Sequence, residues 1–268
     1  MLGQERGELG SRIEDESLKR PNPVGFFDVD GTLIEGFTIT SFAQFLNQKG
    51  FFSGESWRSM QESLITYTKT DKGKKAYRRL AIDLVRAYAQ GLNGQKVEKI
   101  FNQGDAFLEE VLSGVIPEYR IYDFSRELVK VVGRVARTIA VSGSPIEPIL
   151  PLARYLGFSG VEATKCRIST GYYTGEVDLN LALDTAKRKL ISRYLEKGIN
   201  VQLSFAFGDT HHDIPVLEVV GNPFVLGNNQ LLHQIGKKQG WTVIDNGKEV
   251  IETVRNRIKL VFANKEGD

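Results

Sequence analysis

The sequence predicts an α/β protein, in which an all-helical cap is inserted into a doubly wound, Rossmann-like parallel sheet. Two observations predict this fold. After about residue 116, short apolar stretches with the composition of buried strands alternate with helical stretches. Between the first and the second predicted strand, residues 38–114 show helical patterns and no clear strand.

The core elements are marked by their apolar composition and by the turn residues between them. Pro145 suits the first turn of a helix, and Gly198 suits a helix end. We expect strands over 24–29, 137–141, 160–162, 201–207, 223–225 and 241–244, a hairpin over 165–175, and helices over 124–132, 145–156, 185–197, 214–220, 230–239 and 248–262.

The expected domain organisation has three parts. These are a flexible N-terminal tail over 1–22, a catalytic core over 23–36 and 116–268, and a helical cap over 37–115. Breaks that contain glycine divide the cap into helices expected over 40–49, 55–69, 74–89 and 95–112. The cap is expected to open and close about hinges near 34–36 and 115–117.

Composition excludes several classes of protein. The net charge of +2 gives no indication of nucleic-acid binding, and one cysteine with three histidines disfavours a Cys/His metal site. The apolar runs are shorter than the ~20 residues that a membrane-spanning helix needs. The charged N-terminus has no apolar segment typical of a secretory signal, so we expect a cytoplasmic protein that binds neither membrane nor nucleic acid.

The run Asp28-Val29-Asp30-Gly31-Thr32 follows the first predicted strand directly. Side chains alternate along a strand, so Asp28 and Asp30 are expected to leave the same face and to converge. Converging carboxylates repel each other unless a cation or a shared proton relieves them. A hard divalent ion such as Mg²⁺ suits this arrangement; the alternative is an ordinary acidic turn.

Three further polar elements follow in chain order. Ser142-Gly143 follows the second predicted strand, Lys187 and Lys189 lie on a predicted helix, and Gly208-Asp209-Thr210-His211-His212-Asp213 follows a later strand. In order and spacing, these elements and the Asp28 run resemble the four motifs of haloacid dehalogenase superfamily hydrolases, in the phosphoserine-phosphatase-like subfamily IB. The resemblance covers about residues 25–244.

The resemblance implies a Mg²⁺-dependent phosphomonoesterase that acts through an aspartyl-phosphate intermediate on a small organic phosphate. Asp28 would be the nucleophile. Asp30 would be the general acid and base, and its main-chain carbonyl would contact the ion. Gly31 would let the backbone approach the phosphate closely, beside Thr32.

The later motifs imply the remaining roles. Ser142 and Gly143 would bind the phosphoryl oxygens. Two alternatives stay open here, namely that Ser142 is only a helix N-cap and that Ser144 supplies the hydroxyl.

Charge and metal binding are assigned to the last two motifs. Lys187 would neutralise the phosphoryl charge, with Lys189 as the alternative. Asp209 would bind the ion directly, and Asp213 would orient the lysine or a water. The implied ligand set is Asp28, Asp30, Asp209 and Asp213. His211 and His212 are expected to be loop residues near the ion, because no histidine precedes them as a histidine-based phosphohydrolase would require.

A phospho-receiver module and a catalytically silent binding protein are the alternatives of another class. A receiver module has neither a helical insertion after its first strand nor a late Gly-Asp-x-x-x-Asp element. The silent protein has no support, because every residue that the reaction needs has a candidate of the right type.

The cap is expected to select the ester. Phosphoserine phosphatases carry a glutamate nine residues after the nucleophile, and Phe37 stands there in this chain, with Glu35 offset by two. Arg78, Arg79 and Arg86 are candidates to bind a second anionic group. Four aromatic residues of the cap either line the cleft or pack the cap's own core; they are Phe37, Phe42, Tyr67 and Tyr77. If they line the cleft, they indicate a small or moderately apolar substrate, and phosphoserine is the alternative.

Overall fold

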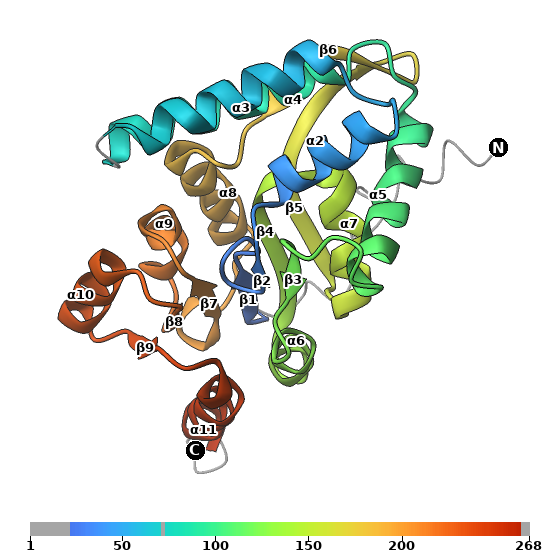
Figure 1. The fold of residues 1–268 in the computed structure, drawn as a ribbon. Helices are drawn as coiled ribbons and strands as arrows, with labels where there is room; N and C mark the ends of the chain where they lie inside the picture. Colours follow the sequence, from blue (N-terminus) through green and yellow to red (C-terminus); the bar gives the residue numbers. More distant parts are fainter. Residues whose placement is uncertain (1–21, 71–72, 264–268) are drawn as a thin grey trace.

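The computed structural model describes residues 22–70 and 73–263, so the predicted tail lies outside the described residues except for Asn22. A seven-stranded sheet forms the centre, in the order β6-β5-β4-β1-β7-β8-β9 (Figure 1). Neighbouring strands are parallel except for the β5–β6 pair. The strands are β1 Val24–Phe27, β4 Arg137–Pro145, β5 Gly160–Ser169, β6 Tyr172–Leu179, β7 Phe205–Gly208, β8 Asn222–Leu226 and β9 Thr242–Ile244.

Helices cover both faces of the sheet. Side chains alternate along β1, so Phe27 joins the apolar cluster under one set of helices and Phe26 joins the cluster on the opposite face. The first set is α6 Ser125–Gly133, α7 Ile146–Leu156 and α11 Val250–Ala263, and the second is α8 Asp184–Glu196, α9 Ile214–Leu217 and α10 Gln230–Gln239. This arrangement confirms the doubly wound α/β fold.

The four helices predicted for the cap are present. They are α2 Thr38–Gln48, α3 Gly54–Thr68, α4 Lys74–Gly91 and α5 Val97–Leu112. The chain enters and leaves this segment through a two-stranded antiparallel sheet of β2 Ile34–Glu35 and β3 Arg120–Ile121. Phe42, Tyr88 and Phe107 of the helices belong to the same apolar cluster as core residues, so the packing is continuous across the predicted domain boundaries, which stay a prediction.

The structure corrects the predicted strands at three places. The strand expected over 201–207 begins as a 3-10 turn, Val201–Leu203, and is extended only from Phe205. The strand expected over 24–29 ends at Phe27. The strand at 160–162 and the hairpin at 165–175 are one long hairpin, β5–β6, which turns at Thr170 and Gly171.

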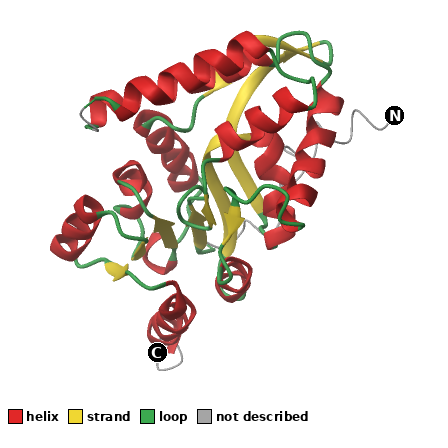
Figure 2. Ribbon diagram, in the orientation of Figure 1, coloured by secondary structure: helices red, strands yellow, loops and turns green. Residues whose placement is uncertain are grey.

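The long hairpin extends from the sheet to the cap (Figure 2). Its buried residue Tyr173 packs within the apolar cluster that contains α4. Pairing with an edge strand and burial against the cap extend these strands beyond their apolar segment, which local composition does not indicate. No helix within residues 22–70 and 73–263 has both the length and the apolar character needed to cross a membrane.

Candidate active site

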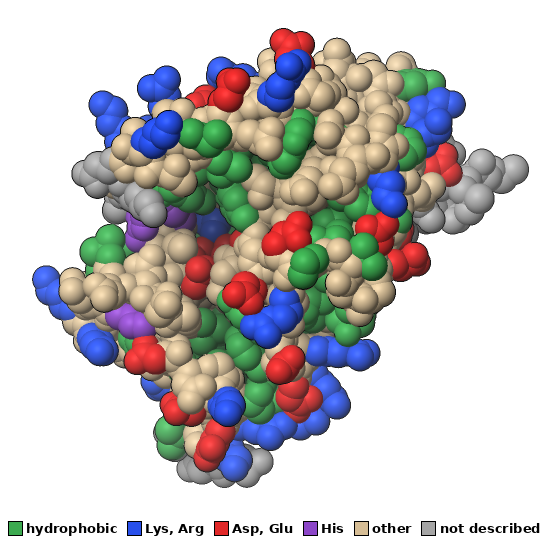
Figure 3. Space-filling view, viewed as in Figure 1, with side chains coloured by type: hydrophobic (Ala, Val, Ile, Leu, Met, Phe, Trp, Pro, Cys, Tyr) green, Lys and Arg blue, Asp and Glu red, His purple; other side chains and the backbone are tan. Residues whose placement is uncertain are grey.

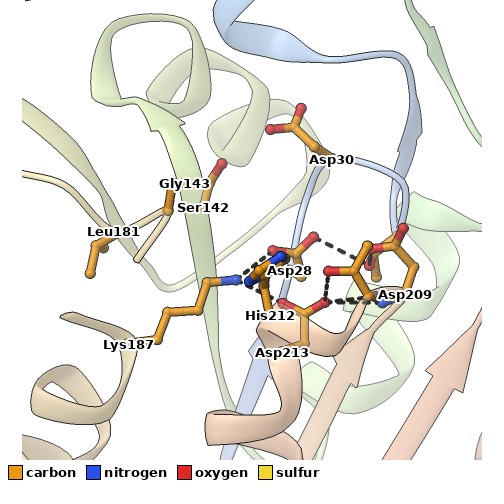
Figure 4. A network of polar contacts seen from close by, with 12 residues as sticks. Asp28, Asp30, Ser142, Gly143, Leu181, Lys187, Asp209, His212 and Asp213 are labelled. Atoms are coloured by element: carbon orange, nitrogen blue, oxygen red, sulfur yellow. Dashed lines mark hydrogen bonds and ion pairs between the residues drawn. The ribbon is translucent and has the colours of Figure 1, made fainter. Parts of the chain in front are cut away.

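Three carboxylates meet at the carboxyl edge of the sheet. One oxygen each of Asp28, Asp209 and Asp213 lies within 4.8 Å of the other two (Figure 4). Asp28 follows β1 and Asp209 follows β7, and these neighbouring parallel strands end side by side, with the Asp28 N–H donating to the Phe207 carbonyl at 2.9 Å. Parallel pairing therefore brings together two residues that are far apart in the sequence.

A buried lysine lies between two of these carboxylates. Lys187 of α8 donates from Nζ to Oδ1 of Asp28 at 3.0 Å and to Oδ1 of Asp213 at 2.7 Å, and its side chain is 4% exposed. Burial opposes its charge, but Asp213 and Asp28 raise the pKa of Lys187 above its ordinary value, so it remains an ammonium group. Lys189, the alternative, is exposed.

The cluster carries more negative charge than one ammonium group can balance. Burial, and then repulsion from Asp213, raises the pKa of Asp28 well above its ordinary value. The same two causes raise the pKa of Asp209 to about 7. Burial opposes ionisation of Asp213 too, but Lys187 holds its pKa below the ordinary value. An oxygen-only donor set with uncompensated negative charge fits a hard divalent cation such as Mg²⁺.

Hydrogen-bond donors of the loop at 208–213 converge on the carboxylate of Asp213. Oδ2 of Asp213 accepts from the backbone N–H groups of Asp209 and Thr210, at 3.2 and 3.0 Å, and from the Thr210 hydroxyl at 3.2 Å. Both oxygens of Asp213 thus already have partners, whereas the structure gives Oδ2 of Asp209 none from a described side chain. Asp209 is therefore the best placed of the three to bind an ion directly, whereas Asp28 and Asp213 both share the ammonium group of Lys187.

Gly31 and Thr32 pack directly against the carboxylates. Gly31 has φ +83°, and a Cβ atom there would lie 2.2 Å from Oδ2 of Asp209, so both the conformation and the space require glycine. The Thr32 hydroxyl lies 3.0 Å from Oδ1 of Asp209 and 3.4 Å from Oδ2 of Asp28. Thr32 is fully buried and its N–H donates to the Val29 carbonyl at 3.2 Å, so binding of phosphate by Gly31 and Thr32 stays a prediction.

The position of the Asp30 side chain differs from the expectation that the two aspartates of the first motif converge. Because β1 ends at Phe27 and the chain turns at Gly31, strand alternation does not extend through Asp30. Its carboxylate lies outside the group of three (Figure 4). It accepts hydrogen bonds from Thr38 and Ser144. The side chain is therefore not among the candidate ion ligands, and the expected contact through its main-chain carbonyl stays a prediction.

Ser142 and Gly143 lie at the end of β4, on the side of the site that faces Leu181 (Figure 4). The Ser142 hydroxyl accepts from the Ser144 N–H at 3.0 Å, and a Cβ atom on Gly143 would approach Ala182 to 2.9 Å. The hydroxyls of Ser142 and Ser144, which the sequence left as alternatives, thus have different partners, because the Ser144 hydroxyl donates to Asp30. Binding of phosphate by Ser142 and Gly143 stays a prediction.

A tyrosine of the cap covers the histidine loop. The ring of Tyr77 on α4 stacks on His212, with centroids 3.6 Å apart and planes 20° apart. Nδ1 of His212 lies 2.9 Å from Oδ1 of Asp184, at the start of α8. Histidine, basic and acidic side chains gather in a hollow between the cap helices and the core (Figure 3). Of the cap aromatic residues named from the sequence, Tyr77 reaches the site, whereas Phe42 is fully buried.

The cap arginines lie away from these contacts. Arg78 and Arg79 are exposed, and Arg79 pairs with Asp83 at 3.7 Å. Arg86 lines a cavity of about 440 Å³ between α4 and β6, and none of the three carboxylates lines this cavity. Glu35 pairs with Arg120 at 2.9 Å on the surface.

Several curated relatives carry phosphatase names. The chain is 25% identical over 223 residues to phosphoserine phosphatase SerB1 of Mycobacterium tuberculosis, covering 82% of this chain and 70% of that protein. It is 21% identical over 231 residues to a histidinol-phosphatase of Neisseria meningitidis, covering 83% of this chain and 98% of that protein.

A solved structure shares the fold. It is a phosphoserine phosphatase with an analogue of its phospho-aspartyl intermediate, and it superimposes with a TM-score of 0.55 at 18% identity, covering 87% of this chain and 99% of that one. A family model for haloacid dehalogenase-like hydrolases matches residues 26–218, which include all four motifs. The chain therefore belongs to the haloacid dehalogenase-like hydrolase family.

Proposed function

We propose that the protein is a Mg²⁺-dependent phosphomonoesterase that acts through a phosphorylated Asp28. The observation that carries this proposal is the buried cluster of Asp28, Asp209 and Asp213 with Lys187 at the carboxyl edge of the sheet. Family membership and the phosphatase names of several relatives support it.

The ion would be held by Asp28 and Asp209, with Asp213 beside them. When bound, Mg²⁺ offsets the repulsion between an anionic nucleophile and an anionic ester. Lys187 contributes a fixed positive charge on the same side, and its two short contacts hold the ammonium group next to the nucleophile. Ser142 and Gly143 supply a hydroxyl and a backbone N–H for the remaining phosphoryl oxygens.

The reaction proceeds in two displacements. In the first, a carboxylate oxygen of Asp28 forms a bond to phosphorus while the ester P–O bond breaks, and Asp30 gives a proton to the departing alkoxide. In the second, water attacks phosphorus, its proton passes to Asp30, and the bond between phosphorus and Asp28 breaks. Inorganic phosphate leaves, and both aspartates return to their starting state.

The substrate proposed is a small organic phosphate, with phosphoserine as the alternative. The position at which phosphoserine phosphatases carry a glutamate is Phe37, which is half-buried and packs against the apolar core. The nearest acid, Glu35, is engaged by Arg120. Neither residue offers a carboxylate to an amino group in the site, so the geometry favours an ester without that requirement.

The test is phosphate release from p-nitrophenyl phosphate by the full chain, with Mg²⁺ and with EDTA. We expect turnover only with Mg²⁺, and a loss of at least about 1,000-fold in kcat for Asp28→Asn. Asp123→Asn, a change at an exposed aspartate, is the matched control and is expected to keep full activity.

Borohydride trapping identifies the intermediate. It reduces an acyl phosphate, so mass spectrometry should place the modification on the peptide that contains Asp28. An Asp28→Asn variant with undiminished turnover would refute the proposed nucleophile. A panel of esters then ranks phosphoserine against other small phosphates.

A further inference from the structure

The carboxylate of Asp30 is held by the first residue of the cap. Oδ1 of Asp30 accepts from the backbone N–H of Thr38 at 2.9 Å and from the Thr38 hydroxyl. Thr38 begins α2 and is fully buried. The contact therefore joins the motif after β1 to the point where the chain enters the cap.

A serine from the core holds the other oxygen. The Ser144 hydroxyl donates to Oδ2 of Asp30 at 2.6 Å and accepts from the Ile39 N–H at 3.2 Å. The Ile39 N–H thus orients the Ser144 hydroxyl, so that its hydrogen points toward Asp30. Both Thr38 and Ser144 are at most 1% exposed, so these hydroxyls are shielded from bulk solvent.

The chain segment that leaves the cap completes the network. The hydroxyl of Tyr119, just before β3, lies 3.0 Å from the hydroxyl of Thr38. Tyr119 is 3% exposed. A chain of hydrogen bonds thus runs from the exit of the cap through its entry to Asp30 and on to the end of β4.

This network determines where the carboxylate lies relative to the nucleophile. Asp28 points into the cluster with Lys187 and Asp213, whereas Asp30 points away from that cluster (Figure 4). In an in-line displacement the leaving oxygen lies opposite the attacking one. With Asp28 attacking from the sheet edge, the leaving oxygen faces the cap, which is the side on which Thr38 holds Asp30.

We infer that Thr38 and Ser144 are positioning residues, which fix the Asp30 carboxylate on the leaving-group side, and that Tyr119 fixes Thr38 in turn. The inference rests on the proposed function. It assigns a role to Ser144 other than binding phosphate, and it couples the orientation of the general acid to both crossings between core and cap.

The test uses the dependence of the rate on the leaving group. A general acid matters most when the leaving oxygen is strongly basic, so wild-type kcat/KM should vary little across substituted phenyl phosphates. In Thr38→Val and Ser144→Ala we expect a steeper dependence, with losses of roughly tenfold or more on phenyl phosphate and under about threefold on p-nitrophenyl phosphate. Asp30→Asn removes the general acid, so it should show the steepest dependence of kcat/KM on the leaving group. The dependence in Tyr119→Phe should fall between those of the wild type and Thr38→Val.

Two variants separate positioning from a structural effect. Thr38→Ser keeps the hydroxyl and should restore the shallow dependence. Thr40→Val removes a hydroxyl from the same helical turn, one that donates to the Phe37 carbonyl, and should leave the dependence unchanged. If Thr38→Val and Ser144→Ala do not fold, Tyr119→Phe decides the question.

Two outcomes would overturn the inference. One is equal losses on both esters, and the other is no loss on phenyl phosphate. Failure of the proposed function looks different, since Asp28→Asn would then stay active on both esters.

Discussion

Lys187 offsets part of the negative charge of the site. Its ammonium group is buried between Asp28 and Asp213. Removing one member of a buried ion pair leaves an uncompensated charge, which costs several kcal/mol. The same ammonium group lies 3.0 Å from the proposed nucleophile, so its loss affects both stability and rate.

We expect Lys187→Met to lower kcat/KM by about 100-fold or more, because a preorganised charge next to the phosphoryl group is lost. Lys189→Met, two residues away on the same helix and exposed, should retain wild-type activity and stability. Steady-state kinetics and thermal melts of both variants make the comparison. Equal activity of the two variants would exclude Lys187 from the mechanism.

At the scale of elements, α4 and the loop that carries Asp213 meet through an aromatic pair. The ring of Tyr77 stacks on His212, and Oδ1 of Asp184 on α8 lies 2.9 Å from Nδ1 of the same histidine. Burial, despite the opposing charge of Lys187, raises the pKa of Tyr77, which keeps its hydroxyl protonated. The stack thus fixes α4 over the acidic cluster without adding charge.

The stack predicts that Tyr77→Ala weakens closure of the cap over the substrate. An aromatic pair contributes about 0.5–1.5 kcal/mol, so kcat/KM should fall by up to about tenfold. Tyr77→Phe keeps the ring and should stay within about twofold of the wild type. Lys75→Ala, at an exposed position of the same helix, serves as the control. A wild-type KM and kcat in Tyr77→Ala would show that the pair has no part in closure.

At the scale of the whole molecule, a buried carboxyl joins three segments that are distant in the sequence. Glu147 of α7 accepts from the hydroxyls of Tyr88 on α4, at 3.2 Å, and Tyr173 on β6, at 2.7 Å. Its side chain is 1% exposed, and burial raises its pKa above the ordinary value of 4.5. The contact fastens the cap helix and the long hairpin to the core.

The raised pKa of Glu147 predicts a dependence of stability on pH. The folded state binds this proton more tightly than the unfolded state, so its contribution is fully present below about pH 4.5 and is lost as pH rises through the folded pKa. Glu147→Gln cannot ionise. Relative to the wild type, its free energy of unfolding should therefore increase between pH 5 and pH 8 in urea titrations. Glu62→Gln, at an exposed site, should show no such trend, and a flat difference for Glu147→Gln would contradict the prediction.

The sequence by itself determined the fold class, the family and the helices of the cap. Apolar periodicity and glycine breaks are local signals, and four short motifs in a fixed order are readable without coordinates. The same signals placed Asp209 and Lys187 among the candidates for the site, because strand ends and helix starts can be recognised locally.

Only the tertiary structure decided how these side chains are partnered. It set Lys187 rather than Lys189 between the carboxylates, turned Asp30 toward Thr38, and gave Ser144 a different partner from Ser142. These outcomes depend on turns after a strand end and on contacts across more than a hundred residues. Local periodicity carries no information about either, because both are fixed by packing between elements that are distant in the sequence.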